Sequence, residues 1–176
     1  MIRTSVATDF DSIYFIITDA SRAYKGIIPW DCWKEPYMTR EELASEIKNG
    51  VTFWLYEAQS CNHLSSTYSS VQSSVLGVMG VQHMLDATLI RHAYVKTSEQ
   101  NRGVGGELIE HVKALEKGPL LVGTWKDASW AIKFYERHGF FTISSPERKD
   151  DLLKRYWTVP KRQRDESVVL ADRRML

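Results

Sequence analysis

The chain has 176 residues, of which 43% are hydrophobic and 26% are charged, and its formal net charge is +1. This length fits one compact α/β domain over residues 1–176 and leaves little room for a second. The near-neutral charge gives no reason to expect a nucleic acid or an anionic membrane as a partner.

Two cysteines, Cys32 and Cys61, form neither a CxxC pair nor a metal-ligand spacing. We therefore expect no metal site, and a reduced, cytoplasmic setting is the default. Residues 1–5 lack the apolar segment of a signal peptide, and no apolar run is long enough to span a bilayer.

The N-terminal residues predict a strand followed by a helix. Residues 2–7 are expected to form the strand, and Thr8 then begins the helix with Asp11 at the capping-box position. Apolar residues recur at i, i+3, i+4 and i+7 and mark its inner face, namely Ile13, Ile16, Ile17 and Ala20.

A loop, a second helix and a strand are expected next. Residues 23–30 break the helical pattern and predict the loop. Thr39 and Glu42 form a second capping box, and Gly50 is expected to end that helix. Residues 51–57 are rich in β-branched and aromatic side chains, which is typical of a strand.

The middle of the chain predicts two long strands. Residues 60–74 are rich in Ser without a helical period, so they are expected to form an exposed connection. Residues 75–84 and 87–95 predict strands joined by a tight turn at Leu85 and Asp86. Their apolar runs favour a central position in the sheet.

The C-terminal half predicts two helices with a short buried strand, residues 120–124, between them. The first helix spans 103–117, with Leu108, Val112 and Leu115 on its inner face.

The second of these helices is N-capped by Asp127 and ended by Gly139. Two or three strands are expected after it, the last at residues 167–170, which completes a mixed sheet flanked by helices. The inner face of this helix is expected to be formed by Trp130, Ala131, Phe134 and Tyr135.

The glycine-rich segment 94–106 lies between a predicted strand and a predicted helix. Glycine lets a ligand approach the backbone, and a helix N-terminus exposes unpaired N–H groups with partial positive charge, so the segment predicts a pyrophosphate site. It is not a P-loop, because Gly105 is followed by Gly106 and Glu107, and not a Rossmann fingerprint, because position 108 is Leu. A glycine-rich turn without a ligand is the alternative.

Two motifs resemble the GCN5-related N-acetyltransferase (GNAT) superfamily. Gln100-x-x-Gly103-x-Gly105 is similar to its pyrophosphate signature, and residues 131–140 resemble its Ala-x-x-x-Tyr-Glu-x-x-Gly-Phe helix and turn. Residues 23–29 also resemble the substrate-side loop of many members. The resemblance implies an α/β fold with a central mixed, mostly antiparallel twisted sheet of six to seven strands and helices on both faces.

The resemblance also implies an activity and its site. Acetyl-CoA would be the co-substrate, and a primary amine would attack its thioester directly. The backbone at Tyr94 and Val95 would pair with pantetheine and polarise the thioester carbonyl. Tyr135 would protonate the leaving sulfur, although simple packing is the alternative. The implied cofactor-binding residues are Tyr94, Val95, Gln100, Asn101, Arg102, Gly103, Val104, Gly105 and Gly106.

The sequence departs from the family at Ala128, where many members have an Asn that contacts pantetheine; Asp127 could substitute, but helix capping is its favoured role. The usual general-base positions match Leu89, Arg91 and Gly123, none of which accepts a proton at neutral pH. The remaining sources of a base are a water chain, an amine that is already neutral, and three side chains, His83, His92 and Glu57.

The implied partner is a small-molecule or peptide amine acceptor. The missing base and Ala128 favour a CoA-binding sensor instead of an enzyme, whereas the intact motifs favour the enzyme. A protein N-terminal acetyltransferase would differ only in its acceptor cleft. If Trp30 and Trp125 face the cleft, a flat aromatic acceptor gains support, as does a cationic amine held over an aromatic face. The apolar last strand would allow a homodimer that shares it.

Overall fold

The computed structural model describes residues 1–58 and 75–175, so the whole Ser-rich segment 60–74 lies outside the described residues. Within these two ranges seven strands form one sheet in the order β1-β2-β3-β4-β5-β7-β6, and only the β4–β5 pair is parallel. This confirms the expected mixed, mostly antiparallel sheet. The strands are β1 (Ile2–Thr4), β2 (Val51–Glu57), β3 (Val75–His83), β4 (Thr88–Val95), β5 (Leu120–Trp125), β6 (Phe140–Thr142) and β7 (Ser167–Asp172).

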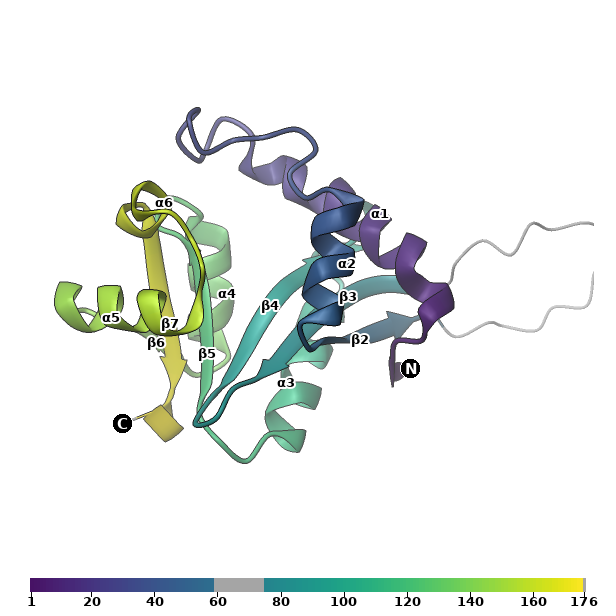
Figure 1. Ribbon diagram of the computed structural model, residues 1–176. Helices are drawn as coiled ribbons and strands as arrows, with labels where there is room; N and C mark the ends of the chain where they lie inside the picture. The colour runs from purple at the N-terminus through teal and green to yellow at the C-terminus, as the bar shows by residue number, and fades with distance from the viewer. Residues whose placement is uncertain (59–74, 176) are drawn as a thin grey trace, which may run out of the picture.

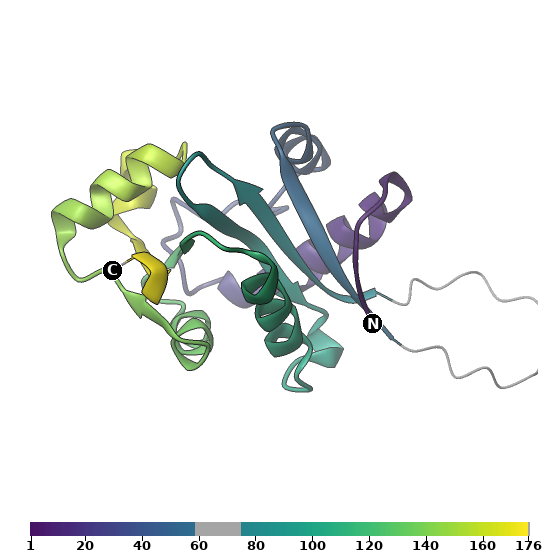
Figure 2. The same cartoon turned by 90° about the horizontal axis from the view of Figure 1, so that it is seen from below.

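Helices cover both faces of the sheet (Figures 1 and 2). One face carries α3 and α4, which share one cluster of buried apolar side chains, and the other carries α1 and α2 over a second cluster and α5 over a third. No helix in the described part of the chain is long and apolar enough to cross a membrane. The helices are α1 (Phe10–Ser21), α2 (Arg40–Lys48), α3 (Val104–Leu115), α4 (Ser129–Arg137), α5 (Pro146–Tyr156) and α6 (Lys161–Asp165).

The N-terminal strand is shorter than expected, and the capping box at Thr8 is wrong. A 3₁₀ turn follows β1, and the Asp9 carboxylate accepts hydrogen bonds from the Val6 backbone N–H at 2.7 Å and from the Arg3 guanidinium at 2.7 and 2.8 Å. Asp9 therefore joins β1 to the start of α1, so the capping interaction involves Val6 and Asp9 instead of Thr8 and Asp11. The apolar face expected for α1 is confirmed by the burial of Ile13, Ile16, Ile17 and Ala20.

Helix α2 begins and ends where the sequence predicts. The Thr39 hydroxyl accepts from the Glu42 backbone N–H at 3.2 Å, and the Glu42 carboxylate accepts from the Thr39 N–H at 2.8 Å. Gly50 follows the helix with a φ of +95°, a left-handed conformation that favours glycine. Leu43 is fully buried, and Glu46 lies one turn further along.

The capping box should contribute measurably to stability. Replacing Thr39 with Ala removes the hydroxyl that accepts from the Glu42 N–H, so we expect a loss of about 1 kcal/mol of unfolding free energy in urea denaturation. Thr39→Ser keeps the acceptor and should stay within a few tenths of a kcal/mol of wild type. An unchanged urea midpoint in the alanine variant would contradict this role.

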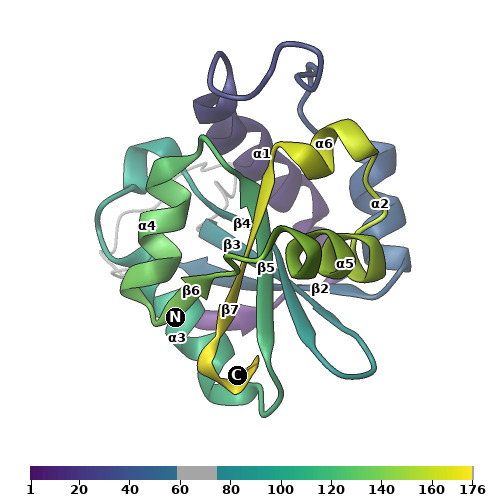
Figure 3. The ribbon, with the colours of Figure 1, turned by 90° about the vertical axis from the view of Figure 1, so that its left-hand side faces the viewer.

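Two strands, β6 and β7, follow α4 as expected for the C-terminal part, but the two helices α5 and α6 that lie between them were not predicted. Ser145 accepts from the Arg148 N–H at 3.2 Å, and Pro146 occupies the first helical turn, so α5 has its own start signal. Strand β7 pairs with β5 on one side and β6 on the other (Figure 3). The last strand is therefore an inner strand of the sheet, paired on both sides at Leu170 and Ala171, and its sharing in a homodimer stays a prediction.

Several expectations about α3 and α4 are also corrected. Helix α3 ends at Leu115, which is 49% exposed and not on the inner face, whereas Ile109, which was not expected there, is fully buried. Asp127 does not cap α4; the N-cap is the buried Ala128, which has no hydroxyl or carboxylate to offer. Trp130, on the first turn of α4, is exposed and not part of an inner face.

Candidate functional site

The central feature of the site is the separation of β4 from β5. Residues 88–90 pair with residues 120–122, and there the pairing ends although both strands continue. Figure 1 shows the two strands diverging from this point. A cleft of about 1060 Å³ lies where they separate.

A β-bulge in β4 accompanies the separation. Gly80 pairs with Arg91 and Val78 pairs with Tyr94, so two residues of β4 stand opposite one residue of β3. The first of these two, His92, has a φ of +45°. A bulge of this kind bends its strand and re-aims the side chains beside it.

The residues expected to bind the cofactor gather along this cleft, with one exception. Tyr94 and Val95 line it from the end of β4, and the loop and first turn of α3 follow. Arg102 does not line the cleft; its side chain is 69% exposed and pairs with Glu99 at 3.2 Å. The lining includes Gln100, Asn101, Gly103, Val104, Gly105 and Gly106.

The N-terminus of α3 opens onto the cleft without a side-chain cap. Gly103 is its N-cap residue with a φ of +86°, and Asn101 also has a positive φ of +62°. The first amides of α3 therefore remain available to an anion. Gln100 donates from its side-chain amide to the Val95 carbonyl at 3.3 Å, which ties this loop to the end of β4.

Gly105 and Gly106 also have a packing role that the sequence did not reveal. A Cβ on Gly105 would lie 3.3 Å from the Phe134 ring, and a Cβ on Gly106 would lie 3.4 Å from the His138 ring. Their missing side chains let α3 approach α4 closely. A larger residue at Gly105 would therefore disturb α4 as well as the cleft.

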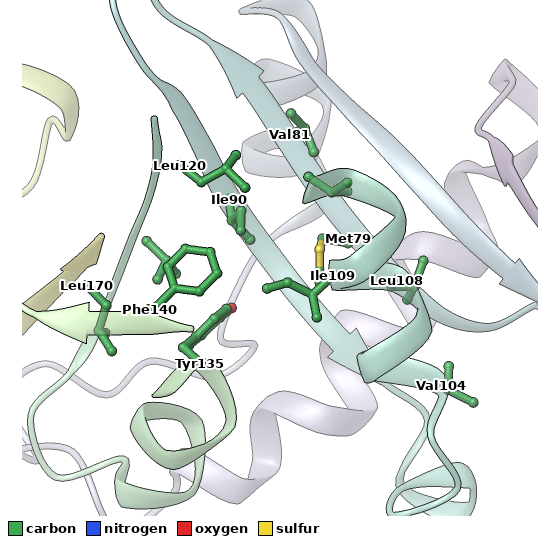
Figure 4. Packing of buried hydrophobic residues seen from close by; sticks show 12 residues of the cluster. Met79, Val81, Ile90, Val104, Leu108, Ile109, Leu120, Tyr135, Phe140 and Leu170 are labelled. Atoms are coloured by element: carbon green, nitrogen blue, oxygen red, sulfur yellow. The ribbon is translucent and has the colours of Figure 1, made fainter. Parts of the chain in front are cut away.

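Tyr135 is buried in the cluster between α3, α4 and the sheet, with 6% of its surface exposed, and it lines the cleft. Its ring meets Phe134 and Phe140 edge-on, and Figure 4 shows its hydroxyl directed away from α4 toward the middle of the cluster. Burial, with a smaller contribution from the Tyr24 phenol, raises the pKa of Tyr135 well above its ordinary value. The residue is thus both packed and open to the cleft.

Three more tyrosines line the same cleft, which the sequence did not predict as a group. The rings of Tyr24 and Tyr37 stack with centroids 5.5 Å apart, and the hydroxyl of Tyr24 interacts with that of Tyr94. Burial raises the pKa of Tyr37 to about 12, against a lowering effect of the hydrogen bond that Trp125 Nε1 donates to it at 2.9 Å. Tyr24 lies in segment 23–29, which resembles the substrate-side loop of the family, and this resemblance is the signal in the sequence from which a tyrosine at the cleft could have been predicted.

The two tryptophans considered for an acceptor pocket differ. Trp125 lines the cleft, whereas Trp30 is not among its lining residues and is 90% exposed. Of these two tryptophans, Trp125 therefore offers the cleft an aromatic surface that would favour a flat acceptor, and Trp30 does not. Trp33 packs against Tyr37, with ring centroids 5.8 Å apart.

The three candidate bases lie in different places. His83 is exposed at the end of β3 and pairs with Glu116 at 3.0 Å, and Glu57 is held by Arg3 at 2.7 Å; neither lines the cleft. His92 does line the cleft. Its Nε2 lies 2.8 Å from a carboxylate oxygen of Glu46, a cleft residue that sequence reasoning missed.

Glu46 is held as a carboxylate. Burial opposes its ionisation, but the hydrogen bond with His92 and the positive charge of nearby Arg91 outweigh burial and lower the pKa of Glu46. Arg91 Nη1 is 3.5 Å from both of its oxygens.

Gly123 is one of the usual base positions of the family, and here the Trp157 indole occupies the space beside it. A Cβ added to Gly123 would lie 3.3 Å from this ring.

Comparison with known proteins gives a family and a fold. The model of the acetyltransferase (GNAT) domain matches residues 49–141. The ribosomal-protein-S18-alanine N-acetyltransferase of Escherichia coli is 18% identical with a TM-score of 0.64, over 98% of this chain and 92% of that chain. The PaiA N-acetyltransferase of Thermoplasma acidophilum, in complex with coenzyme A, is 15% identical with a TM-score of 0.65, over 98% of both chains. A GNAT-family acetyltransferase from Staphylococcus aureus Mu50 is 14% identical with a TM-score of 0.66, over 98% of both chains. Comparison with curated proteins gives no match.

Proposed function

Because the chain belongs to the GNAT acetyltransferase family, we propose that residues 1–176 act as one domain that transfers the acetyl group of acetyl-CoA to a primary amine. The observation that carries the proposal is the meeting of two features at one cleft. The unpaired edge of β4 runs along it, and the uncapped N-terminus of α3 opens into it.

The residues of the cleft suit the chemical parts of acetyl-CoA. The free amides at the start of α3, together with the positive-φ residues Asn101 and Gly103, form an anion site suited to the pyrophosphate. At Tyr94 and Val95, β4 pairs with β3 on one side but not with β5 on the other, and this open side is suited to the amide-containing pantetheine arm. When bound there, acetyl-CoA supplies a thioester whose carbonyl a backbone N–H of β4 can polarise.

Tyr135 is proposed as the proton donor to the departing sulfur. In the transfer a nitrogen–carbon bond forms and the carbon–sulfur bond breaks, and the thiolate needs a proton. The raised pKa of Tyr135 keeps its phenol protonated at neutral pH until that moment. The same burial also raises the proton affinity of a thiolate formed beside it, which offsets the weaker acidity of the phenol.

The rival sensor hypothesis depended on Ala128 and on the lack of a base at the usual positions. His92, with its partner Glu46, brings a proton acceptor into the cleft. This favours an enzyme over a CoA-binding sensor. An acceptor that is a protein N-terminus stays an alternative within the same reaction class.

The test is thiol release from acetyl-CoA with a panel of primary amines, combined with calorimetry of acetyl-CoA binding. The panel spans monoamines, diamines, amino acids and short peptides with free N-termini. We expect binding, and thiol release that requires one class of these amines. Binding without thiol release from any amine would favour the sensor, and no binding would contradict both hypotheses.

A further inference from the structure

We infer that His92 and Glu46 together remove the proton from the acceptor amine, with His92 Nδ1 accepting it and Glu46 holding the ring. This rests on the proposed acetyl transfer and assigns the base that the motif positions lack. A primary amine such as that of lysine has a pKa of about 10.4, so it is mostly protonated near pH 7 and has no lone pair with which to attack.

The bulge in β4 is what brings His92 into the cleft. A regular strand would alternate its side chains between the two faces, but the extra residue opposite Met79 changes this order. His92 has a φ of +45°, which a non-glycine residue adopts only when its surroundings hold it there. The bulge lies just beyond Ile90, the last residue of β4 that pairs with β5, so the ring stands where the cleft opens.

The imidazole is fixed on two sides. Glu46 of α2 is 2.8 Å from Nε2, and the Phe53 ring of β2 stacks beside it with centroids 6.1 Å apart and an interplanar angle of 22°. Because the lowered pKa of Glu46 keeps it a carboxylate, Nε2 donates the hydrogen. Nδ1 is then the nitrogen that carries a lone pair and can take a proton.

The charged groups around the ring have opposing effects. The Glu46 carboxylate stabilises the imidazolium that forms when Nδ1 is protonated, and the Arg91 guanidinium on the same strand opposes it. Arg91 is drawn to Glu46 and also donates to the Tyr156 carbonyl at 3.3 Å. The carboxylate is thus shared between the His92 ring and the Arg91 guanidinium, which holds it in place.

The proton balance is complete without another reagent. The N–H bond of the ammonium breaks, its proton moves to Nδ1, and the freed lone pair forms the bond to the acetyl carbon. The proton donated by Tyr135 goes to the sulfur. After the attack the nitrogen carries two hydrogens and a positive charge, and it loses its second proton to water to give the neutral amide. The Tyr135 phenolate takes one proton from water and His92 releases its proton to water, so that one proton is released overall.

The other described histidines are placed differently. His138 lies between α3 and α4 and pairs with Glu110 at 2.9 Å, beside the proposed phosphate site. His111 meets the Trp54 ring with centroids 4.5 Å apart and does not line the cleft. His83 is exposed and pairs with Glu116 outside the cleft, which makes it a matched control for a His–Glu pair.

The first test compares His92→Gln with His83→Gln in pH profiles of kcat/KM, using the most active amine of the panel. We expect His92→Gln to lose about 100-fold near pH 7, with unchanged acetyl-CoA affinity. The deficit should shrink as the pH approaches the pKa of the amine, because a neutral amine needs no base. His83→Gln should follow the wild-type profile. A His92→Gln profile that parallels wild type at every pH would overturn the inference.

The second test uses Glu46→Gln, whose amide oxygen can still accept the Nε2 hydrogen but carries no charge. The imidazolium that forms during proton transfer loses its stabilising partner, so kcat/KM should fall near pH 7 and the deficit should shrink as the pH approaches the pKa of the amine, as for His92→Gln. A purely structural role would lower kcat/KM by the same factor at every pH, and that result would contradict the pair.

Ring-nitrogen NMR decides the question independently of turnover. Spectra of the wild type with bound CoA should show the neutral His92 ring with its hydrogen on Nε2 and a lone pair on Nδ1. The opposite tautomer, with the hydrogen on Nδ1, would overturn the inference even if acetyl transfer is confirmed. If CoA does not bind, the proposed function itself fails, which calorimetry reports separately.

Discussion

Replacing Tyr135 with Phe is expected to lower kcat by about 100-fold while acetyl-CoA affinity stays within a few-fold of wild type. The change removes only the oxygen that would protonate the sulfur, and the ring contacts with Phe134 and Phe140 remain. The measurement is single-turnover kinetics, because a slow product release would hide the effect in the steady state.

Tyr156 offers a matched control for this variant. It is also 6% exposed, but its hydroxyl donates to Asp86 at 2.7 Å and it does not line the cleft. Tyr156→Phe should therefore reduce stability by about 1 kcal/mol and leave the single-turnover rate unchanged. Equal rates in wild type and Tyr135→Phe would show that the phenol is not the acid.

Replacing Gly105 with Val is expected to abolish measurable acetyl-CoA binding in calorimetry. The added side chain would narrow the approach to the first amides of α3 and would also press on the Phe134 ring, which a Cβ already meets at 3.3 Å. The second effect means that some loss of stability is expected too, so circular dichroism must show that the variant is folded.

A second substitution separates the two causes. Phe134→Leu makes room beside Gly105, so it should recover stability in the Gly105→Val background if helix packing is the source of the loss. Acetyl-CoA binding should stay weak in the double variant, because the valine still stands at the start of α3. A Cβ on Gly118 would meet open space, and this residue lies outside the cleft, so Gly118→Val should bind normally. Wild-type affinity in folded Gly105→Val would contradict the proposed phosphate site.

Local patterns in the sequence were sufficient for much of the fold. The helix α1 face, the Thr39–Glu42 capping box and the bounds of β2 all follow from residues within a few positions of one another. The residues expected to bind the cofactor also line one cleft, apart from Arg102. Such features depend on short-range periodicity and capping, which a single sequence displays directly.

Other features depend on contacts between distant residues. Glu46 and His92 are 46 positions apart, and only the packing of α2 over the bulged strand makes them a pair. The packing role of Gly105 depends on Phe134 in another helix. Helix α5 was missed for a different reason. Ser145 and Pro146 are a local signal for the start of a helix, but only strands were expected in this region.

The short pairing between β4 and β5 has a mechanical consequence. Strands β1–β4 and strands β5, β7 and β6 form two leaves, and the only backbone ladder that joins them spans residues 88–90 and 120–122 in the described part of the chain. On the α3 side the leaves are also fastened by Lys113, which donates to the His138 carbonyl at 2.8 Å, and by the close packing of α3 on α4. On the opposite side the fastenings are side-chain bonds such as that from Trp125 to Tyr37. Beyond these three residue pairs, the two leaves are therefore held together by side chains and not by the sheet itself.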